Sequence, residues 1–324
     1  QMSVPGPASR LRAALTGMVV AAALAFPPGA GAVPGAPGLP GTILGSNHDG
    51  DLVSWTPATG RRATLVAAQP FLPIEDGKFS PDGTRVVFSR RAASTLDHLM
   101  FTVPAAGGVP MRVRPAGPTG RYPWWPSWSG DGRRLLFQAP GRTGLTYDQF
   151  LVSATAPVGA AAPVTRGTVP ARADGVCAGY RKEDYVFGAV WRPGTEEIGV
   201  TAVCDFTLIA ATVTPSGRLV RKMRVSKLGT EPGWVLADWS ADGATGLFAG
   251  WHTDALAVYT LASRSFRVVR WGREAGFRPE QVVLSPDGAW VAATNRSSGV
   301  CTIYPVGGGA PRVVPGLSVV SDWR

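Results

Sequence analysis

The chain has 324 residues, of which 45% are hydrophobic and 17% charged, so it can bury a sizeable core and is not a disordered polymer. Its 41 glycines and 29 prolines are too many for a helical protein and favour a chain that turns often. The formal net charge of +10 favours anionic partners such as cell-wall polymers or lipid headgroups, without specifying one.

The first 32 residues have the pattern of an export signal. Arg10 and Arg12 precede an apolar run from Ala13 to Phe26, and Ala30-Gly31-Ala32 offers small residues for cleavage. The apolar run is shorter than the roughly 20 residues that span a bilayer. We therefore expect residues 1–32 to be a cleaved signal peptide, leaving no transmembrane span in a secreted or periplasmic protein of formal charge +8. The alternative is a retained membrane anchor.

A repeated motif follows a Pro/Gly linker at residues 33–41 and runs through residues 42–324. It is an apolar anchor residue followed by a turn, as in Phe79-Ser80-Pro81-Asp82-Gly83. The anchors are Phe79, Trp128, Trp191, Trp239, Leu284 and Trp323. A spacing mostly in the forties, with about four β-rich runs per unit, is typical of a propeller. We predict an all-β, six-bladed β-propeller of four-stranded blades.

The turn that follows four of the anchors, Phe79, Trp128, Trp239 and Leu284, has a physical explanation. Ser, Pro, Asp and Gly suit the four positions of a type I turn, and Gly tolerates the positive φ of a bulged hairpin exit. We therefore interpret the repeated acidic residues as turn formers, with metal ligation as the alternative. These residues are Asp82, Asp131, Asp242 and Asp287.

The two ends of the repeat region complement each other. Residues 42–66 supply three strand-like pieces without a preceding anchor, and residues 318–324 supply a first strand with nothing after it. Joined, they complete a sixth blade, which we expect to close the ring and to leave no open edge.

The 63-residue spacing between Trp128 and Trp191 indicates an insertion, placed between Gly167 and Gly188. Because it links two blades, we expect it on the rim where the inter-blade links emerge, either as a binding loop or as a decoration. Its candidate ligand-binding residues are Tyr180, Arg181, Lys182, Asp184 and Tyr185. Cys177 and Cys204 share this rim, so we predict a disulfide between them and a free thiol at Cys301.

The same rim carries further candidates. Trp124 and Trp125 could stack on a ligand or pack against the neighbouring blade. His98 and His252 lie at hairpins between second and third strands. Carboxylates open the third strand of several blades: Asp51, Asp97, Asp148, Asp205 and Asp254. They either bond their own hairpins or, as a weaker alternative for the last four, bind a metal ion.

The densest basic run is Arg218, Arg221, Lys222, Arg224 and Lys227. A charged edge strand that resists edge-to-edge pairing explains it, and a polyanion site is the alternative.

The copies of Trp-Ser-Pro-Asp-Gly followed by an apolar strand resemble the TolB-like, or PD40, class of WD40-like propellers, over roughly residues 42–324. That resemblance implies a periplasmic or secreted binding protein, or the non-catalytic propeller of a prolyl-oligopeptidase-like peptidase. The sequence has no Gly-x-Ser-x-Gly elbow, HExxH motif, paired Cys-x-x-Cys or phosphate loop.

We therefore expect an exported, monomeric, non-enzymatic β-propeller without a cofactor. Its expected partner is a protein or another cell-envelope component and not a nucleic acid. The alternative is a metal-dependent lyase or lactone hydrolase, with rim carboxylates holding an ion in the propeller funnel.

Overall fold

The computed structural model describes fourteen stretches of the chain. They are residues 38–69, 74–91, 98–116, 123–140, 147–154, 158–160, 162–163, 176, 185–204, 207–223, 233–250, 255–270, 281–295 and 298–324.

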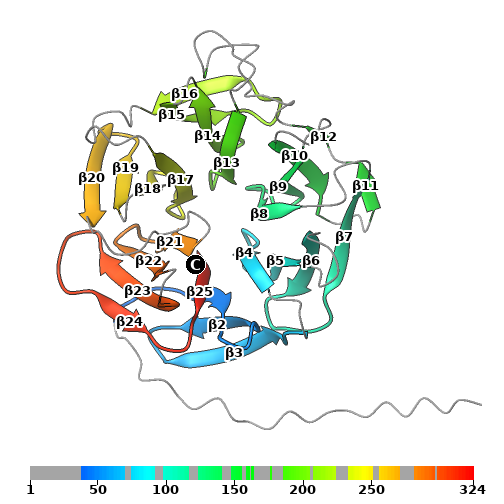
Figure 1. Ribbon diagram of the computed structural model, residues 1–324, viewed down its shortest axis with the longest axis vertical. Helices are drawn as coiled ribbons and strands as arrows, with labels where there is room; N and C mark the ends of the chain where they lie inside the picture. Colours follow the sequence, from blue (N-terminus) through cyan, green and yellow to red (C-terminus); the bar gives the residue numbers. More distant parts are fainter. Residues whose placement is uncertain are drawn as a thin grey trace, which may run out of the picture. The chain divides into compact units, whose positions relative to one another are not determined.

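The described strands form six sheets arranged as blades around a central axis (Figure 1). The innermost strand of each blade carries the anchor residue at or near its end. These strands are β25 (Val319–Trp323), β4 (Ile74–Phe79), β8 (Trp124–Trp128), β13 (Tyr185–Trp191), β17 (Trp234–Trp239) and β21 (Val282–Leu284). The predicted six-bladed β-propeller is confirmed.

Antiparallel strands extend each blade outward from the innermost strand. Blade 1 continues with β1 (Ile43–Ser46), β2 (Leu52–Thr56) and β3 (Arg61–Val66). Blade 2 continues with β5 (Arg85–Arg91), β6 (His98–Pro104) and β7 (Met111–Ala116). Blade 3 continues with β9 (Arg134–Pro140), β10 (Tyr147–Ser153) and β12 (Ala162–Pro163).

Blades 4 to 6 follow the same order. Blade 4 continues with β14 (Ile198–Cys204), β15 (Thr207–Val213) and β16 (Leu219–Met223). Blade 5 continues with β18 (Thr245–Gly250), β19 (Leu256–Thr260) and β20 (Ser265–Arg270). Blade 6 continues with β22 (Trp290–Asn295), β23 (Val300–Pro305) and β24 (Arg312–Val314). The short strand β11 (Val158–Ala160) adds to blade 2 in parallel with β7, which the repeat did not predict.

The blades are held together by side chains that alternate between their two faces. On β5, Val86 and Phe88 join a buried cluster with Leu52 of blade 1. Val87, between them, packs with Trp128 of blade 3. Because both faces of a blade are covered, its strands read as nearly continuous apolar runs.

The repeated turn has the predicted geometry. In its first copy, the N–H of Gly83 donates to the carbonyl of Ser80 at 2.8 Å, and Gly83 has a φ of 70°. The Asp82 carboxylate accepts hydrogen bonds from the Ser80 hydroxyl and the Thr84 N–H. The same contacts recur after Ser129, Ser240 and Ser285. The four Asp residues are therefore turn formers.

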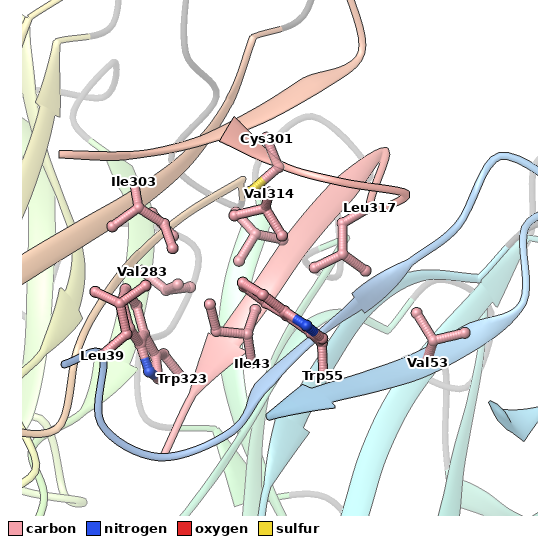
Figure 2. Close-up of a cluster of buried hydrophobic side chains, with 12 residues drawn as sticks. Leu39, Ile43, Val53, Trp55, Val283, Cys301, Ile303, Val314, Leu317 and Trp323 are labelled. Carbon is pink, nitrogen blue, oxygen red and sulfur yellow. The ribbon is translucent and has the colours of Figure 1, made fainter. Parts of the chain in front are cut away.

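The predicted closure is confirmed in blade 1. Strand β25, from the end of the chain, pairs with β1, with Ile43 opposite Trp323. The Trp323 indole donates to the carbonyl of Pro40 at 2.7 Å. Figure 2 shows Leu39 beside Trp323 in a buried cluster that blade 6 completes. Pairing the two ends removes the open edge that either would present alone.

Cys301 lies on β23, the third strand of blade 6, and is a free, buried thiol (Figure 2). Cys204 ends β14, whereas Cys177 lies outside the described residues, so the Cys177–Cys204 bridge stays a prediction. Within the described part of the chain, no helix has the length and apolar character that crossing a bilayer requires.

Candidate functional site in the central channel

The innermost strands of the six blades surround a central space, which we call the channel. Three charged residues from three blades meet there. The Nζ atom of Lys78 lies 3.5 Å from Oδ1 of Asp238 and 3.5 Å from Oδ1 of Asp322. Each residue directly precedes the anchor of an innermost strand, on β4, β17 and β25. These strands lie around the central axis (Figure 1). Side chains that are far apart in sequence therefore form one charge cluster.

Backbone groups hold the two carboxylates in place. Oδ2 of Asp238 accepts the Leu284 N–H at 3.0 Å, and Oδ2 of Asp322 accepts the Phe79 N–H at 2.7 Å. Arg324 Nε lies 3.9 Å from Oδ2 of Asp322. Each carboxylate therefore bonds the innermost strand of a neighbouring blade as well as Lys78, and the cluster has a defined geometry.

The buried charges shift the pKa values of two groups. Burial lowers the pKa of Lys78, but the Asp238 and Asp322 carboxylates outweigh it, so the pKa lies above its usual 10.5. Burial raises the pKa of Asp238 above 3.8, helped by the Asp322 charge and opposed by Lys78. Lys78 therefore holds its proton more tightly because two carboxylates face it, whereas Asp238 does so because burial disfavours its charged form.

A cavity opens beside this cluster, on the side where the innermost strands begin. It offers about 60 Å³ to water-sized molecules. Its lining is mostly apolar, with a few polar groups: Asp76, Gly77, Lys78, Trp125, Pro126, Ser127, Gly188, Ala189, Val190, Val235, Leu236, Ala237, Val282 and Ser321. A smaller cavity, of about 40 Å³, lies where the strands end and shares Lys78, Ser127 and Val190. A mostly apolar lining with a few polar groups is also typical of ligand sites.

Of the predicted rim residues, Trp125 lines the cavity. It is half-buried and has a φ of 50°, a conformation that L-residues rarely adopt. Trp124, one residue earlier, packs its ring edge-on against His98 at 5.1 Å. His98 is buried, with Nδ1 3.3 Å from a Glu75 carboxylate oxygen. Trp124 and His98 therefore pack against each other, whereas Trp125 faces the channel cavity.

The other ligand-binding candidates lie outside the described residues. These are Tyr180, Arg181, Lys182, Asp184 and His252. Tyr185 begins β13, which places its backbone at the start of an innermost strand, but its side chain is not among those described.

Most of the carboxylates proposed as metal ligands likewise lie outside the described residues. Asp97, Asp205 and Asp254 lie outside the described residues, as does the side chain of Asp148. Asp51 accepts a hydrogen bond at 3.0 Å from the Asn47 side-chain amide of its own hairpin and another at 2.6 Å from the N–H of Ala68, which follows β3. The described residues contain no group of three or more His, Cys, Asp or Glu side chains placed to hold a metal ion.

The basic run on blade 4 lies on a sheet edge. Arg221 and Lys222 are exposed on β16, the outermost strand, and Arg218 is exposed just before it. The expected edge-strand position is therefore confirmed for these residues, whereas Arg224 and Lys227 lie outside the described residues.

The sequence interpretation missed the channel cluster. A signal was present, because the residue before the anchor is charged in three of the six copies: Lys78, Asp238 and Asp322. The significance of that position depends on the strands that surround it in the ring.

Comparisons with solved structures agree with this fold. TolB from Acinetobacter baumannii superposes with a TM-score of 0.64 at 13% identity, over 88% of this chain and 68% of that one. A putative TolB from Agrobacterium tumefaciens superposes with a TM-score of 0.58 at 14% identity, over 84% of this chain and 88% of that one. A chain of a nidogen–laminin complex gives 0.60 at 10% identity, over 87% and 96%.

No protein-family model matches the sequence, and no curated protein matches it either. At such low identities the structural matches establish the fold alone. The chain therefore has a six-bladed β-propeller fold similar to that of the TolB structures, with a charged cluster near its central axis.

Proposed function

We propose that the protein is an exported, non-enzymatic β-propeller that binds a protein or another cell-envelope component at the channel mouth bordered by Trp125. In this proposal residues 1–32 are a cleaved signal, residues 33–41 a linker and residues 42–324 the binding domain, in the periplasm or outside the cell. The protein acts as a monomer and binds no nucleic acid.

The observation that carries the proposal is the half-buried Trp125, in its unusual conformation at the cavity wall. Backbone strain of this kind persists where surrounding structure imposes it, and it clusters at ligand sites. An aromatic ring beside apolar strand edges offers a large contact area for a hydrophobic or planar side chain. The neighbouring Asp76 and Ser321 supply polar contacts at the same wall.

The insertion between blades 3 and 4 extends this mouth in our proposal. Gly188 lines the cavity from β13, and the chain immediately before that strand contains Tyr180 to Asp184. The predicted Cys177–Cys204 bridge would restrict the insertion. The TolB-like resemblance, which implies exported binding proteins, supports the same function.

The test compares capture of envelope proteins by four forms of residues 33–324. They are the unmodified domain, Trp125→Ala, a form with residues 170–186 replaced by a short Gly-Ser link, and Trp290→Ala as a control. Trp290 is half-buried on β22 and does not line the channel cavity. Circular dichroism checks that each form is folded.

A single partner that the unmodified domain and Trp290→Ala capture, and that Trp125→Ala and the loop replacement lose, is the expected result. Equal capture by all four forms would contradict the assigned site. Capture of no partner by folded protein would contradict protein binding and shift attention to a small ligand in the channel.

A further inference from the structure

Arg90, near the end of β5, is a buried cation without a counter-ion among the described residues. Its exposed fraction is 5%, and its Nε atom has no hydrogen-bond partner in the described structure. The guanidinium carbon lies 5.8 Å from the ring centre of Phe88 and 5.5 Å from that of Phe101. Arg90 therefore lies over two aromatic rings without a carboxylate opposite it.

This arrangement is unfavourable for the protein alone. Burial lowers the pKa of Arg90, but an arginine stays protonated at neutral pH, so the charge persists. Contact with aromatic faces recovers only part of the lost hydration. Buried charges are normally paired, and one that no described residue pairs points to a partner outside the described part of the chain, such as a bound anion.

Two further arginines lie on the same face of blade 2. Phe88 is opposite Phe101, and Phe101 is opposite Arg112 on the next strand. Side chains directly opposite one another on neighbouring strands share a face of the sheet. Residues two apart on one strand also share a face, so Arg90, two residues after Phe88, and Arg114, two residues after Arg112, lie on this face as well. Arg112 and Arg114 are exposed, and neither forms an ion pair with a described residue.

Protection of a sheet edge does not explain Arg114. Strand β11 already pairs with β7 there, with Val158 opposite Arg114, so that part of the edge is covered. The face belongs to the seam between blades 1 and 2, where Phe88 packs with Leu52 and Leu65. The strands β3 and β7, which flank the outer end of the seam, contain no acidic residue. Their charges therefore favour an approaching anion.

We propose that Arg90, Arg112 and Arg114 bind an oxyanion of the phosphate class at the seam between blades 1 and 2. Guanidinium groups donate paired hydrogen bonds that match phosphate oxygens. Strands β5 and β7 are two strand spacings apart, about 10 Å, so long side chains from both reach one anion between them. The site is separate from the channel, and its existence does not depend on the channel function.

The first experiment titrates inorganic phosphate into the folded domain by isothermal calorimetry at constant ionic strength. The variants are Arg90→Met, the double variant Arg112→Gln/Arg114→Gln, and the control Arg267→Gln. Arg267 is an exposed arginine on β20, the outermost strand of blade 5. We expect saturable binding that is weakened at least about 10-fold in the first two variants and unchanged in the control.

Thermal stability gives a second measurement that does not depend on detecting heat of binding. Without phosphate, Arg90→Met should raise Tm, because it replaces an unpaired buried charge with an apolar chain of similar length. Saturating phosphate should raise the Tm of the unmodified domain and leave that of Arg90→Met nearly constant.

Two results would overturn the proposal. One is absent phosphate binding, or binding of equal strength in all variants. The other is a Tm for Arg90→Met that falls below that of the unmodified domain by the same amount with and without phosphate, which would make Arg90 a packing residue.

The source of the phosphate group is tested next, with phosphatidylglycerol vesicles, phosphatidylcholine vesicles and soluble polyphosphate. Cosedimentation with the phosphatidylglycerol vesicles alone, lost in the double variant, would identify a lipid headgroup. Competition by polyphosphate would identify a polymer. Saturation by inorganic phosphate without either effect would identify the free anion.

Discussion

Lys78 and Asp322 join the second blade to the last strand of the chain. Lys78 Nζ lies 3.5 Å from Asp322 Oδ1, and the other oxygen of that carboxylate accepts the N–H of Phe79, the residue after Lys78. Since Lys78 also contacts Asp238 of blade 5, one ammonium group links three blades across the channel. The cluster therefore stabilises the closed ring as well as lining its centre.

Replacing Lys78 by Met should destabilise the domain by about 3–5 kcal/mol, because it leaves two buried carboxylates without their shared cation. Urea denaturation monitored by circular dichroism measures the change. Lys222→Met, at an exposed position on β16, is the control and should change the free energy of unfolding by less than about 0.5 kcal/mol. A change as small in Lys78→Met would contradict the structural role.

The cost of Lys78→Met should also depend on pH. Lys78 opposes the raised pKa of Asp238, so the pKa should rise further without it. A carboxyl group whose folded pKa lies above its unfolded value of 3.8 contributes stability at low pH and loses it as pH rises through the folded pKa. The destabilisation should therefore be smaller at pH about 4.5 than at pH about 7. Denaturation at both pH values measures this, and an equal cost at both would contradict it.

Two turn glycines should respond differently to alanine. Gly83 has a φ of 70° and open space where a Cβ would lie, whereas a Cβ on Gly243, at φ 66°, would lie 2.7 Å from the carbonyl oxygen of Pro193. Gly83→Ala should cost about 1–2 kcal/mol from backbone strain alone. Gly243→Ala adds a steric clash and should cost more. Denaturant unfolding of both variants compares them, and equal costs would show that the neighbouring blade yields.

The Ser80 hydroxyl should control the acidity of Asp82. Its hydrogen bond, followed by that of the Thr84 N–H, lowers the pKa of Asp82 to about 2. A lowered folded pKa contributes stability above pH 3.8, and this contribution is lost as pH falls towards 2. Ser80→Ala should move the pKa towards 3.8, as carboxyl NMR titration can measure. Asp131, whose pKa Ser129 lowers in the same way, is the internal control.

Cys301 should not react with thiol reagents in the folded protein. Burial raises the pKa of its thiol to about 12, although a Thr294 hydrogen bond opposes the shift, so almost no thiolate forms at neutral pH. Labelling should require denaturant. One reactive thiol in denatured, unreduced protein and three after reduction would also confirm the predicted Cys177–Cys204 bridge. Rapid labelling of folded protein would contradict the burial of Cys301.

The fold followed from the sequence because each blade repeats the same local pattern. Ser80 to Gly83 form a turn through contacts within a few residues, so their geometry is predictable without the rest of the chain. Closure by β25 was predictable for a related reason, since an unpaired strand at one end matched a deficit at the other. The parallel pairing of β11 with β7 was not, because it joins segments of different blades outside the repeat.

The candidate sites divide along the same line. The rim position of Trp125 was expected from the period, but its unusual φ and its place in the cavity wall depend on neighbouring blades. The sequence did not distinguish Lys78 and Arg90 from the other basic residues, of which the chain has 32 in all. Their burial became visible only in the folded ring.

The sequence by itself determined the turns, because they depend on hydrogen bonds within a few residues, and it determined the number of blades and the closure, because these follow from the period of the repeat and from complementary strands at its two ends. The tertiary structure alone decided which charges are buried and what faces them. Lys78 acquired two carboxylates and Arg90 acquired two aromatic rings from strands that only folding brings together. Desolvation and Coulomb energies depend on those distances and not on chain position.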